Sequence, residues 1–346
     1  MSQGTILHLF GWDKKFLLPF RDLIHEHFSN GKHHFIVYGD FEPGDLPASP
    51  DTTVYPNLLK KSFALSLALQ QADKIILHGI FSNHLYYLLA LHPWCLKKCY
   101  WVICGGDLYD HNVMRKDWRW WKNWLFRSFA IKHFGHFVTF VKGDYELAQK
   151  WYGADGQYHE SIMYPSNVFH AERLKPSRHS SINIQIGNSA APSNNHFESL
   201  ELLRPFRNQD IVIYAPLSYG NKKHAEKVIK LGIELFGAKF IPLTEFMPFE
   251  QYIEFLRKID IAIFNHKRQQ GMGNLITLLG LGKKIYMRSD LMPVRLFAEI
   301  GVKVYDVENI DLDPLNDEVK NHNVKIIKEY FSKERLCHQW EEIFES

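Results

Sequence analysis

The fold is predicted first from two neighbouring segments, the apolar run Ile259-Asp-Ile-Ala-Ile-Phe264 and the polar, glycine-containing run Arg268-Gln-Gln-Gly-Met-Gly-Asn274. The apolar run predicts a buried strand of a parallel sheet. Glycines, an arginine and two amides at the end of such a strand are typical of a site for a phosphate-bearing ligand, such as a nucleotide or a nucleotide sugar. An ordinary strand-to-helix turn is the structural alternative, but it does not require these polar residues together. The residues that we expect to contact the ligand are Arg268, Gln269, Gln270, Gly271 and Gly273.

Short apolar runs of the same kind alternate with helical patterns along the whole chain. This alternation predicts parallel sheets with helices on both faces, which is an α/β fold. The first series of predicted strands covers residues 5–10, 34–38, 74–78, 99–103 and 137–141. The second series covers residues 182–186, 210–215, 239–241, 259–264 and 284–287, with a further apolar segment near 301–305. Two doubly wound, Rossmann-like domains with a ligand cleft between them form the GT-B plan.

The polar run Lys175-Pro-Ser-Arg-His-Ser-Ser181 lacks periodicity and is the predicted linker between the two domains. It gives a first domain of residues 1–176 and a second domain of residues 182–323. The C-terminal stretch 324–346 has an amphipathic helical pattern. We expect this helix to cross back to the first domain.

Composition narrows the class of protein. The 346 residues exceed what one compact core usually supports, and 46% hydrophobic with 23% charged residues is typical of a soluble globular protein. The net charge of +3 is too small to indicate a nucleic-acid partner. Aromatic residues, at 14%, fit carbohydrate stacking or a membrane interface, and equally a large aromatic core. The four cysteines lack zinc spacing and indicate reduced cytosolic thiols, and we expect neither an export signal nor a bilayer span.

A second candidate ligand loop follows the strand predicted at 182–186. Gly187, Asn188 and Ser189 form a turn, and Asn194 stands just before a helix that begins near Phe197. Backbone N–H groups and the positive end of a helix suit a diphosphate. The alternative is that Asn194 serves only as a helix cap. The G-x-G-x-x-G dinucleotide fingerprint is absent here and at the first strand, which argues against a dehydrogenase.

Two further residues follow predicted strands of the second domain. Tyr219 lies in a loop that ends a strand, where its ring suits stacking on a base or sugar, although a loop of this kind needs no ligand. Glu245 lies just past the next strand, where a carboxylate suits a ribose or sugar hydroxyl. As a surface glutamate it would need no function.

In the first domain, His78 and Asp107 each close an apolar strand. Ligands of open α/β sheets bind at such carboxyl ends. An imidazole or carboxylate in that place can take a proton from an attacking hydroxyl, so both are candidate catalytic residues. The alternative for His78 is a structural histidine at a strand end.

The segment from Met114 to Arg127 combines tryptophans with cations. At helical spacing Trp118, Trp121, Leu125 and Phe129 form one stripe, whereas Trp120 and Trp124 lie off it. This pattern favours a helix on an anionic membrane surface, with a core helix as the alternative. The predicted interface residues are Arg115, Trp118, Arg119, Trp121, Lys122 and Trp124.

These motifs together resemble the 4-alpha-L-fucosyltransferase family, the TDP-N-acetylfucosamine:lipid II N-acetylfucosaminyltransferases of enterobacterial common-antigen assembly. The matching stretches run over nearly the whole chain: His78-Gly79 with Phe81, Gly106-Asp-Leu-Tyr109, Gly187-Asn-Ser189 with Ser193-Asn194 and His196, Tyr219, and Arg268-Gln-Gln-Gly271 with Gly273. The last is the most specific. The chain departs from the family at Cys104-Gly-Gly, where Trp-Gly-Ala is expected.

The resemblance implies a GT-B hexosyltransferase, peripheral on the inner face of the cytoplasmic membrane. It would transfer a 4-acetamido-4,6-dideoxyhexose from a TDP-sugar, bound by the second domain, to a polyprenyl-diphosphate-linked glycan held by the first. Because the departure lies in the first domain, an O-antigen intermediate is an alternative acceptor to the common-antigen lipid. No D-x-D run ends a strand, so we expect no metal and no other cofactor. Asp107 is the leading candidate for the base, with His78 behind it.

Two other classes of function are consistent with these residues. One is a non-catalytic GT-B-like scaffold that docks on membranes. The other is a two-domain sugar-nucleotide epimerase, which would convert the nucleotide sugar without a lipid acceptor.

Overall fold

The computed structural model describes residues 4–11, 14–28, 32–39, 44, 46–113, 117–170 and 180–346. It divides into two compact units, Met1–Ser166 with Lys333–Ser346, and Asn167–Ser332. Arg115 and all of the expected linker except Ser180 and Ser181 lie outside the described residues.

The first unit is built on a parallel sheet with the strand order β3-β2-β1-β4-β5-β6-β7. Its strands are β1 (Ile6–Phe10), β2 (His33–Tyr38), β3 (Thr52–Tyr55), β4 (Lys74–His78), β5 (Cys99–Val102), β6 (His136–Val138) and β7 (Gln157–His159). The sequence missed β3 and β7. Both are short strands at the edges of the sheet, and neither has a fully buried apolar run like those of the central strands.

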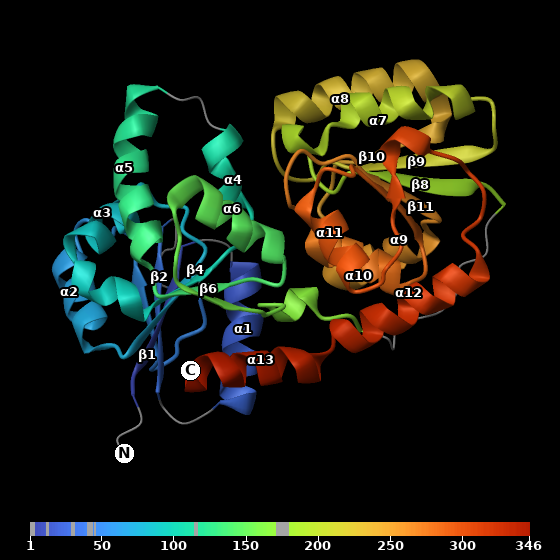
Figure 1. The fold of residues 1–346 in the computed structure, drawn as a ribbon. Helices are drawn as coiled ribbons and strands as arrows, with labels where there is room; N and C mark the ends of the chain where they lie inside the picture. Colours follow the sequence, from blue (N-terminus) through green and yellow to red (C-terminus); the bar gives the residue numbers. More distant parts are fainter. Residues whose placement is uncertain are drawn as a thin grey trace. The chain divides into compact units, whose positions relative to one another are not determined.

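Helices cover both faces of this sheet (Figure 1). One face carries α1 (Lys14–His27), and the other carries α2 (Ser62–Gln71), α3 (Asn83–Leu91), α5 (Trp118–His133) and α6 (Lys142–Tyr152), with α4 (Gly106–Val113) preceding α5. Crossovers between parallel strands are right-handed, and the strand order runs in opposite directions before and after β3, so α1 falls on the opposite face from the later helices.

The second unit is a smaller parallel sheet in the order β10-β9-β8-β11-β12-β13. Its strands are β8 (Ile182–Ile186), β9 (Ile211–Pro216), β10 (Phe240–Leu243), β11 (Ile261–Phe264), β12 (Lys284–Met287) and β13 (Tyr305–Asp306). Its helices are α7 (His196–Leu203), α8 (Lys222–Phe236), α9 (Phe249–Lys258), α10 (Met272–Gly280), α11 (Met292–Glu299) and α12 (Asp317–Tyr330). The α/β prediction is therefore confirmed in both units.

The direction of winding reverses once in each sheet. The reversal lies between β1 and β4 in the first unit and between β8 and β11 in the second. Loops on either side of a reversal diverge, and ligands of doubly wound sheets bind in the opening at the carboxyl ends of those strands. The loop after β8 and the loop after β11 are the two glycine-containing loops that the sequence had singled out.

The C-terminal stretch differs from the single helix expected at 324–346. It consists of α12 and a separate helix α13 (Lys333–Glu345), and the break between them falls at the boundary of the two units. At the break, the carbonyl of Phe331 accepts a hydrogen bond of 2.8 Å from the Phe169 N–H. Each helix buries its apolar face in its own unit: α12 buries Ile327, and α13 buries Trp340, whose ring lies 5.0 Å from that of Phe20 in α1.

Candidate functional site

The loop after β8 is organised around one buried amide. Asn194, which is fully buried, accepts a hydrogen bond of 2.9 Å from the Asn188 N–H and donates to Ser189 Oγ at 3.1 Å. Gly187 has a φ of +63°, and a Cβ there would lie 2.7 Å from Asn194 Oδ1. Glycine at position 187 is therefore required by both backbone and packing. Asn194 was expected to contact the ligand, but the structure places its side chain inside the loop, where it holds the turn in shape.

Side chains of three loops meet at Asn188. Its Oδ1 accepts from Gln270 Nε2 at 3.4 Å, and its Nδ2 donates to the Tyr219 hydroxyl at 3.3 Å. Ser193 Oγ donates to Gln270 Oε1 at 2.6 Å. A Cβ on Gly271 would lie 3.1 Å from Asn188 Cγ, so these loops approach closely. The fold thus brings together predicted site residues that are far apart in the sequence.

The loop after β11 ends at the start of helix α10. Gly271 is the N-cap, with a φ of +68°, and Gly273 lies in the first turn. The half-buried Arg268 donates from Nη1 to the Gln269 carbonyl at 3.2 Å. A guanidinium beside a helix N-terminus gives this end of the sheet a positive potential, which suits an anionic ligand.

Several buried polar atoms in the same loops have no hydrogen-bond partner among the described residues. They are both amide atoms of Asn265, Nε2 of His196, Nε2 of His266 and Oε1 of Gln269. Asn265 is fully buried, and His266 is 1% exposed. Buried polar atoms are nearly always paired in proteins, so a group of exceptions at one strand end marks a place where a ligand can supply the partners.

The two imidazoles of this group are held neutral. Burial, and to a lesser extent His224, lowers the pKa of His196 to about 3. Burial, followed by the charge of Arg268, lowers the pKa of His266 to about 3. A neutral imidazole has one N–H and one acceptor nitrogen, so each can make a directed hydrogen bond without adding charge.

Asn265 and His266 were missed by the sequence reasoning. They follow the apolar run 259–264 directly, and the rule that identified Arg268 applies to them as well. Glu245, by contrast, was predicted as a ligand residue and is exposed beyond β10. Strand β9 lies between β10 and β8, so the structure does not bring Glu245 into the cluster of loops around Asn188.

The two candidate catalytic residues of the first unit are buried. Asp107 accepts hydrogen bonds from Trp101 Nε1 at 2.8 Å, the Cys104 N–H at 3.0 Å and the Ile80 N–H at 3.1 Å. Burial raises the pKa of its carboxyl, while these donors oppose the shift. The carboxylate thus ties the loop after β4 to the loop after β5. Its contacts support a positioning role, and they do not offer an oxygen to an incoming hydroxyl.

His78 is also fully buried, and both of its ring nitrogens lie in hydrogen-bond contacts. Its Nε2 lies 3.0 Å from His8 Nδ1, and its Nδ1 lies 3.0 Å from the Tyr164 hydroxyl. The Phe10 ring stacks on it at 3.8 Å. Neither ring nitrogen is open to an incoming hydroxyl, so these contacts do not support the expected role of His78 as a base that touches the acceptor directly.

Helix α5 presents its aromatic stripe to solvent. Trp118 is 71% exposed, Trp121 54% and Leu125 63%, and Arg119 and Lys122 are exposed beside them. Trp124 is half-buried and packs against the core of the first unit, so it does not belong to the exposed stripe. Across the described ranges, no helix combines the length and the apolar character needed to cross a membrane.

The fold and the paired loops define the class of protein. HepE of Anabaena, whose structure was solved with UDP and glucose, superimposes with a TM-score of 0.68 at 10% identity, covering 99% of each chain. A glycosyltransferase of Rickettsia africae gives a TM-score of 0.65 at 11% identity, covering 100% of this chain and 98% of the other. WaaG, a glycosyltransferase involved in lipopolysaccharide biosynthesis, gives 0.62 at 12% identity, covering 98% of each. The fold is that of the GT-B glycosyltransferases. The profile of the 4-alpha-L-fucosyltransferases, glycosyl transferase group 56, matches residues 6–330, and the chain belongs to this family.

Proposed function

We propose that the protein transfers an N-acetylfucosamine-type sugar, a 4-acetamido-4,6-dideoxyhexose, from a TDP-sugar to a polyprenyl-diphosphate-linked glycan. The assignment of the donor site rests on one observation: the loops after β8 and β11 contact each other where the winding of the second sheet reverses. Family membership supports a glycosyl transfer, and the neighbouring fold of HepE, solved with UDP and glucose, supports a nucleotide-sugar donor.

The donor diphosphate would lie against the N-terminus of α10. Arg268 and the N–H groups near Gly187 and Gly271 would stabilise the negative charge that develops on the diphosphate as the glycosidic bond breaks. This arrangement supplies positive charge from the chain itself and supports a metal-independent transfer. Within the described residues, no group of His, Cys, Asp and Glu side chains has the arrangement of a metal site.

The remaining parts of the donor would contact the aromatic and polar rim of the loops. Tyr219 is 53% exposed and its hydroxyl is anchored by Asn188 Nδ2 at 3.3 Å, so its ring is held in place to stack on a base. The partnerless atoms of Asn265 and Gln269 would hydrogen-bond the sugar or the ribose. A polar ligand that satisfies them is favoured over an apolar one.

The first unit would lie on the inner surface of the cytoplasmic membrane, where a polyprenyl-linked acceptor is found. Helices α2, α3 and α5 contain no Asp or Glu, and they lie on the same face of the first sheet (Figure 1). Besides the α5 stripe, Phe63 of α2 is 77% exposed, next to the exposed Lys60 and Lys61. Exposed aromatics with cations and no acidic groups suit an anionic lipid surface.

Isothermal titration with TDP, UDP and GDP tests the donor assignment. We expect selective binding of TDP, and a loss of at least about tenfold in affinity in Arg268→Ala, because a charge-assisted contact to phosphate is lost. Arg204→Ala is the matched control, since Arg204 is 54% exposed and paired with Glu201 on the protein surface. If none of the nucleotides binds, the transferase proposal fails and the membrane scaffold becomes the better explanation.

Product analysis separates transfer from epimerisation. With a TDP-sugar and a lipid acceptor, transfer yields a longer lipid-linked glycan and free TDP. An epimerase would change the TDP-sugar without any acceptor. Flotation with phosphatidylglycerol vesicles tests the membrane part: Trp118→Ser with Trp121→Ser should reduce binding, whereas Ile233→Ser, at a residue 52% exposed in the second unit, should not.

A further inference from the structure

Three histidines form a hydrogen-bonded series through the core of the first unit. His33 Nδ1 lies 2.9 Å from His8 Nε2, and His8 Nδ1 lies 3.0 Å from His78 Nε2. They stand on the adjacent strands β2, β1 and β4. His8 and His78 are fully buried, and His33 is 7% exposed.

Strand register explains why the three rings meet. On β1, Ile6 is opposite His33 of β2, and Phe10 is opposite His78 of β4. Residues 6, 8 and 10 of a strand point to the same face, so His33, His8 and His78 share one face and follow each other diagonally across three strands. Phe20 of α1 and Phe344 of α13 pack against the His8 ring at 5.6 and 6.0 Å, so this is the face that α1 and α13 cover.

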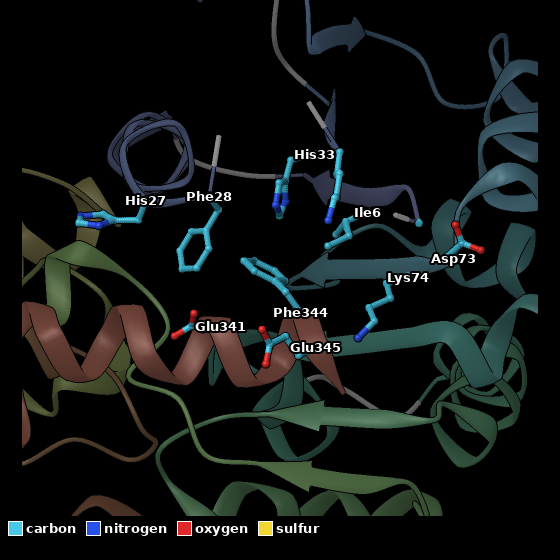
Figure 2. A pocket seen from close by; sticks show the side chains of 11 residues that line it. Ile6, His27, Phe28, His33, Asp73, Lys74, Glu341, Phe344 and Glu345 are labelled. Atoms are coloured by element: carbon cyan, nitrogen blue, oxygen red, sulfur yellow. The ribbon is translucent and has the colours of Figure 1, made fainter. Parts of the chain in front are cut away.

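One end of the series opens into a cavity of about 270 Å³ at the amino-terminal edge of the sheet. Figure 2 shows the His33 ring beside Phe28 and Phe344, with Lys74 and Glu345 also lining the cavity. The His33 and Phe344 rings are 4.7 Å apart. The mixed charges of the lining and its size suit water rather than a large ligand.

The other end of the series reaches the carboxyl-terminal edge. His78 Nδ1 lies 3.0 Å from the Tyr164 hydroxyl, which in turn lies 3.8 Å from Cys104 Sγ in the loop after β5. Met163 has a φ of +68°, an uncommon conformation for a residue other than glycine, and its carbonyl accepts a hydrogen bond of 2.8 Å from Trp340 Nε1. A strained residue held in this way fixes the position of the adjacent Tyr164.

The pairing of nitrogens allows only two arrangements of protons. Each contact joins Nδ1 of one ring to Nε2 of the next, and a neutral imidazole carries a single N–H. The three histidines therefore all carry the proton on Nδ1, or all carry it on Nε2. Burial keeps them neutral: it lowers the pKa of His8 and of His78 well below the ordinary value, and that of His33 to about 4, with Lys32 adding to the shift at His33.

We propose that His33, His8 and His78 form a proton relay that connects the cavity to the carboxyl-terminal edge of the first sheet. Its use in catalysis rests on the proposed function, in which the acceptor hydroxyl loses a proton as its oxygen bonds to the sugar. Starting from the Nε2–H set, that proton reaches the Tyr164 hydroxyl by way of water, since Tyr164 is only 2% exposed, and Tyr164 passes its own proton to His78 Nδ1. His78 and His8 each pass on their Nε2 proton, and His33 releases one from Nε2 into the cavity. All three rings end in the Nδ1–H set. When a proton enters His33 Nε2 from the cavity, each ring passes on its Nδ1 proton in the opposite direction, Tyr164 releases one proton at the carboxyl-terminal edge, and the first set is restored.

Nitrogen-15 NMR of the histidine rings tests the relay without any substrate. In the wild-type protein at neutral pH we expect the three rings to be neutral and to share one tautomer, either Nδ1–H or Nε2–H, in the same population. Different tautomers among the three, or a doubly protonated ring in the middle of the series, would overturn the proposal. This result is independent of whether TDP binds.

Turnover in two matched variants tests whether the relay is used. His8→Phe keeps an aromatic ring but removes the contacts to His33 and His78. We expect kcat to fall by roughly tenfold or more, with a smaller solvent deuterium isotope effect and unchanged TDP affinity. The control is His136→Phe: His136 lies 2.9 Å from His159 in the same sheet, outside the series. Folding of both variants is checked by the retained TDP affinity and by circular dichroism. If His8→Phe keeps the kcat and the isotope effect of the control, the relay has no part in transfer.

Discussion

Ser193 and Gln270, 77 residues apart in the sequence, are joined by a hydrogen bond of 2.6 Å from Ser193 Oγ to Gln270 Oε1. The backbone makes a second link, since the Lys267 N–H donates to the Ser193 carbonyl at 2.9 Å. These two bonds hold the loop after β8 against the loop after β11. The two halves of the candidate donor site are thereby positioned before a ligand arrives.

Removing the side-chain link should weaken ligand binding. Ser193→Ala leaves Gln270 free to move, and we expect TDP affinity to fall several-fold, in line with about 1 kcal/mol for a hydrogen bond. Titration calorimetry measures the change. Ser181→Ala is the control, because Ser181 bonds Asp210 at the start of β8, away from the carboxyl ends of the strands. Equal affinity in the two variants would show that the link does not organise the site.

Gly187 and Gly237 both have a positive φ. Comparing alanine variants at the two positions separates the effect of backbone strain from that of steric conflict. At Gly187, φ is +63° and a Cβ would also meet His196 Nε2 at 2.8 Å, whereas at Gly237, φ is +57° and nothing lies within 4 Å. Gly237 has a ψ of −129°, outside the left-handed helical region, so Gly237→Ala should cost about 1–3 kcal/mol of stability and leave TDP binding intact. Gly187→Ala should abolish measurable binding. Thermal unfolding and titration of both variants check this, and binding retained in Gly187→Ala would remove the turn from the site.

We expect Asn265 to favour binding of the TDP-sugar while lowering the free energy of unfolding of the free protein. Its two partnerless amide atoms make the free protein less stable, so Asn265→Leu is expected to raise the free energy of unfolding by about 1 kcal/mol. The same change should weaken binding of the TDP-sugar. Asn183→Leu is the contrasting variant: Asn183 Nδ2 donates to the Lys258 carbonyl at 2.8 Å, so its loss should be destabilising. An Asn265→Leu protein that is less stable than wild type would contradict the interpretation.

Asp107→Asn distinguishes a positioning residue from a base. Three donors converge on the carboxylate, and an amide would turn its NH₂ toward one of them, so we expect a loss of about 1–3 kcal/mol in urea unfolding. Asp117→Asn should have little effect, because Asp117 caps α5 through Trp120 N and asparagine caps equally well. Full stability with lost turnover would instead favour Asp107 as the base.

Asp144 makes the stability of the first unit depend on pH. Burial raises the pKa of this carboxyl from 3.8 to about 8, although the Tyr109 hydroxyl donates to it at 2.9 Å. The folded protein holds a proton that the unfolded chain releases, so the stabilisation is complete below about 4 and is lost as the pH rises to about 8. Asp144→Asn should gain stability relative to wild type over this range. Asp155→Asn, at an exposed carboxylate, should parallel wild type.

Much of the fold could be predicted from local pattern. Strands β1, β4, β8, β11 and β12 were predicted within two residues, because most of their side chains are apolar, as a strand covered on both faces requires. Strands β3 and β7 were not predicted, because neither of these two edge strands carries such an apolar run. The C-terminal helix was predicted as one element because an amphipathic pattern shows that a face is buried, but not in which unit.

Sequence patterns alone were sufficient to predict the α/β class, the family resemblance and the glycine-containing strand ends near Gly187 and Gly271. Tertiary structure decided which of those strand ends meet, since the strand order sets β8 beside β11 and leaves Glu245 beyond the edge strand. It also decided the places of His78 and Asp107, which chain position suggested as bases and which packing surrounds with hydrogen-bond partners. The physical reason is the same in each case: local pattern fixes the periodicity of a segment, whereas partners far along the chain are fixed by strand order and register.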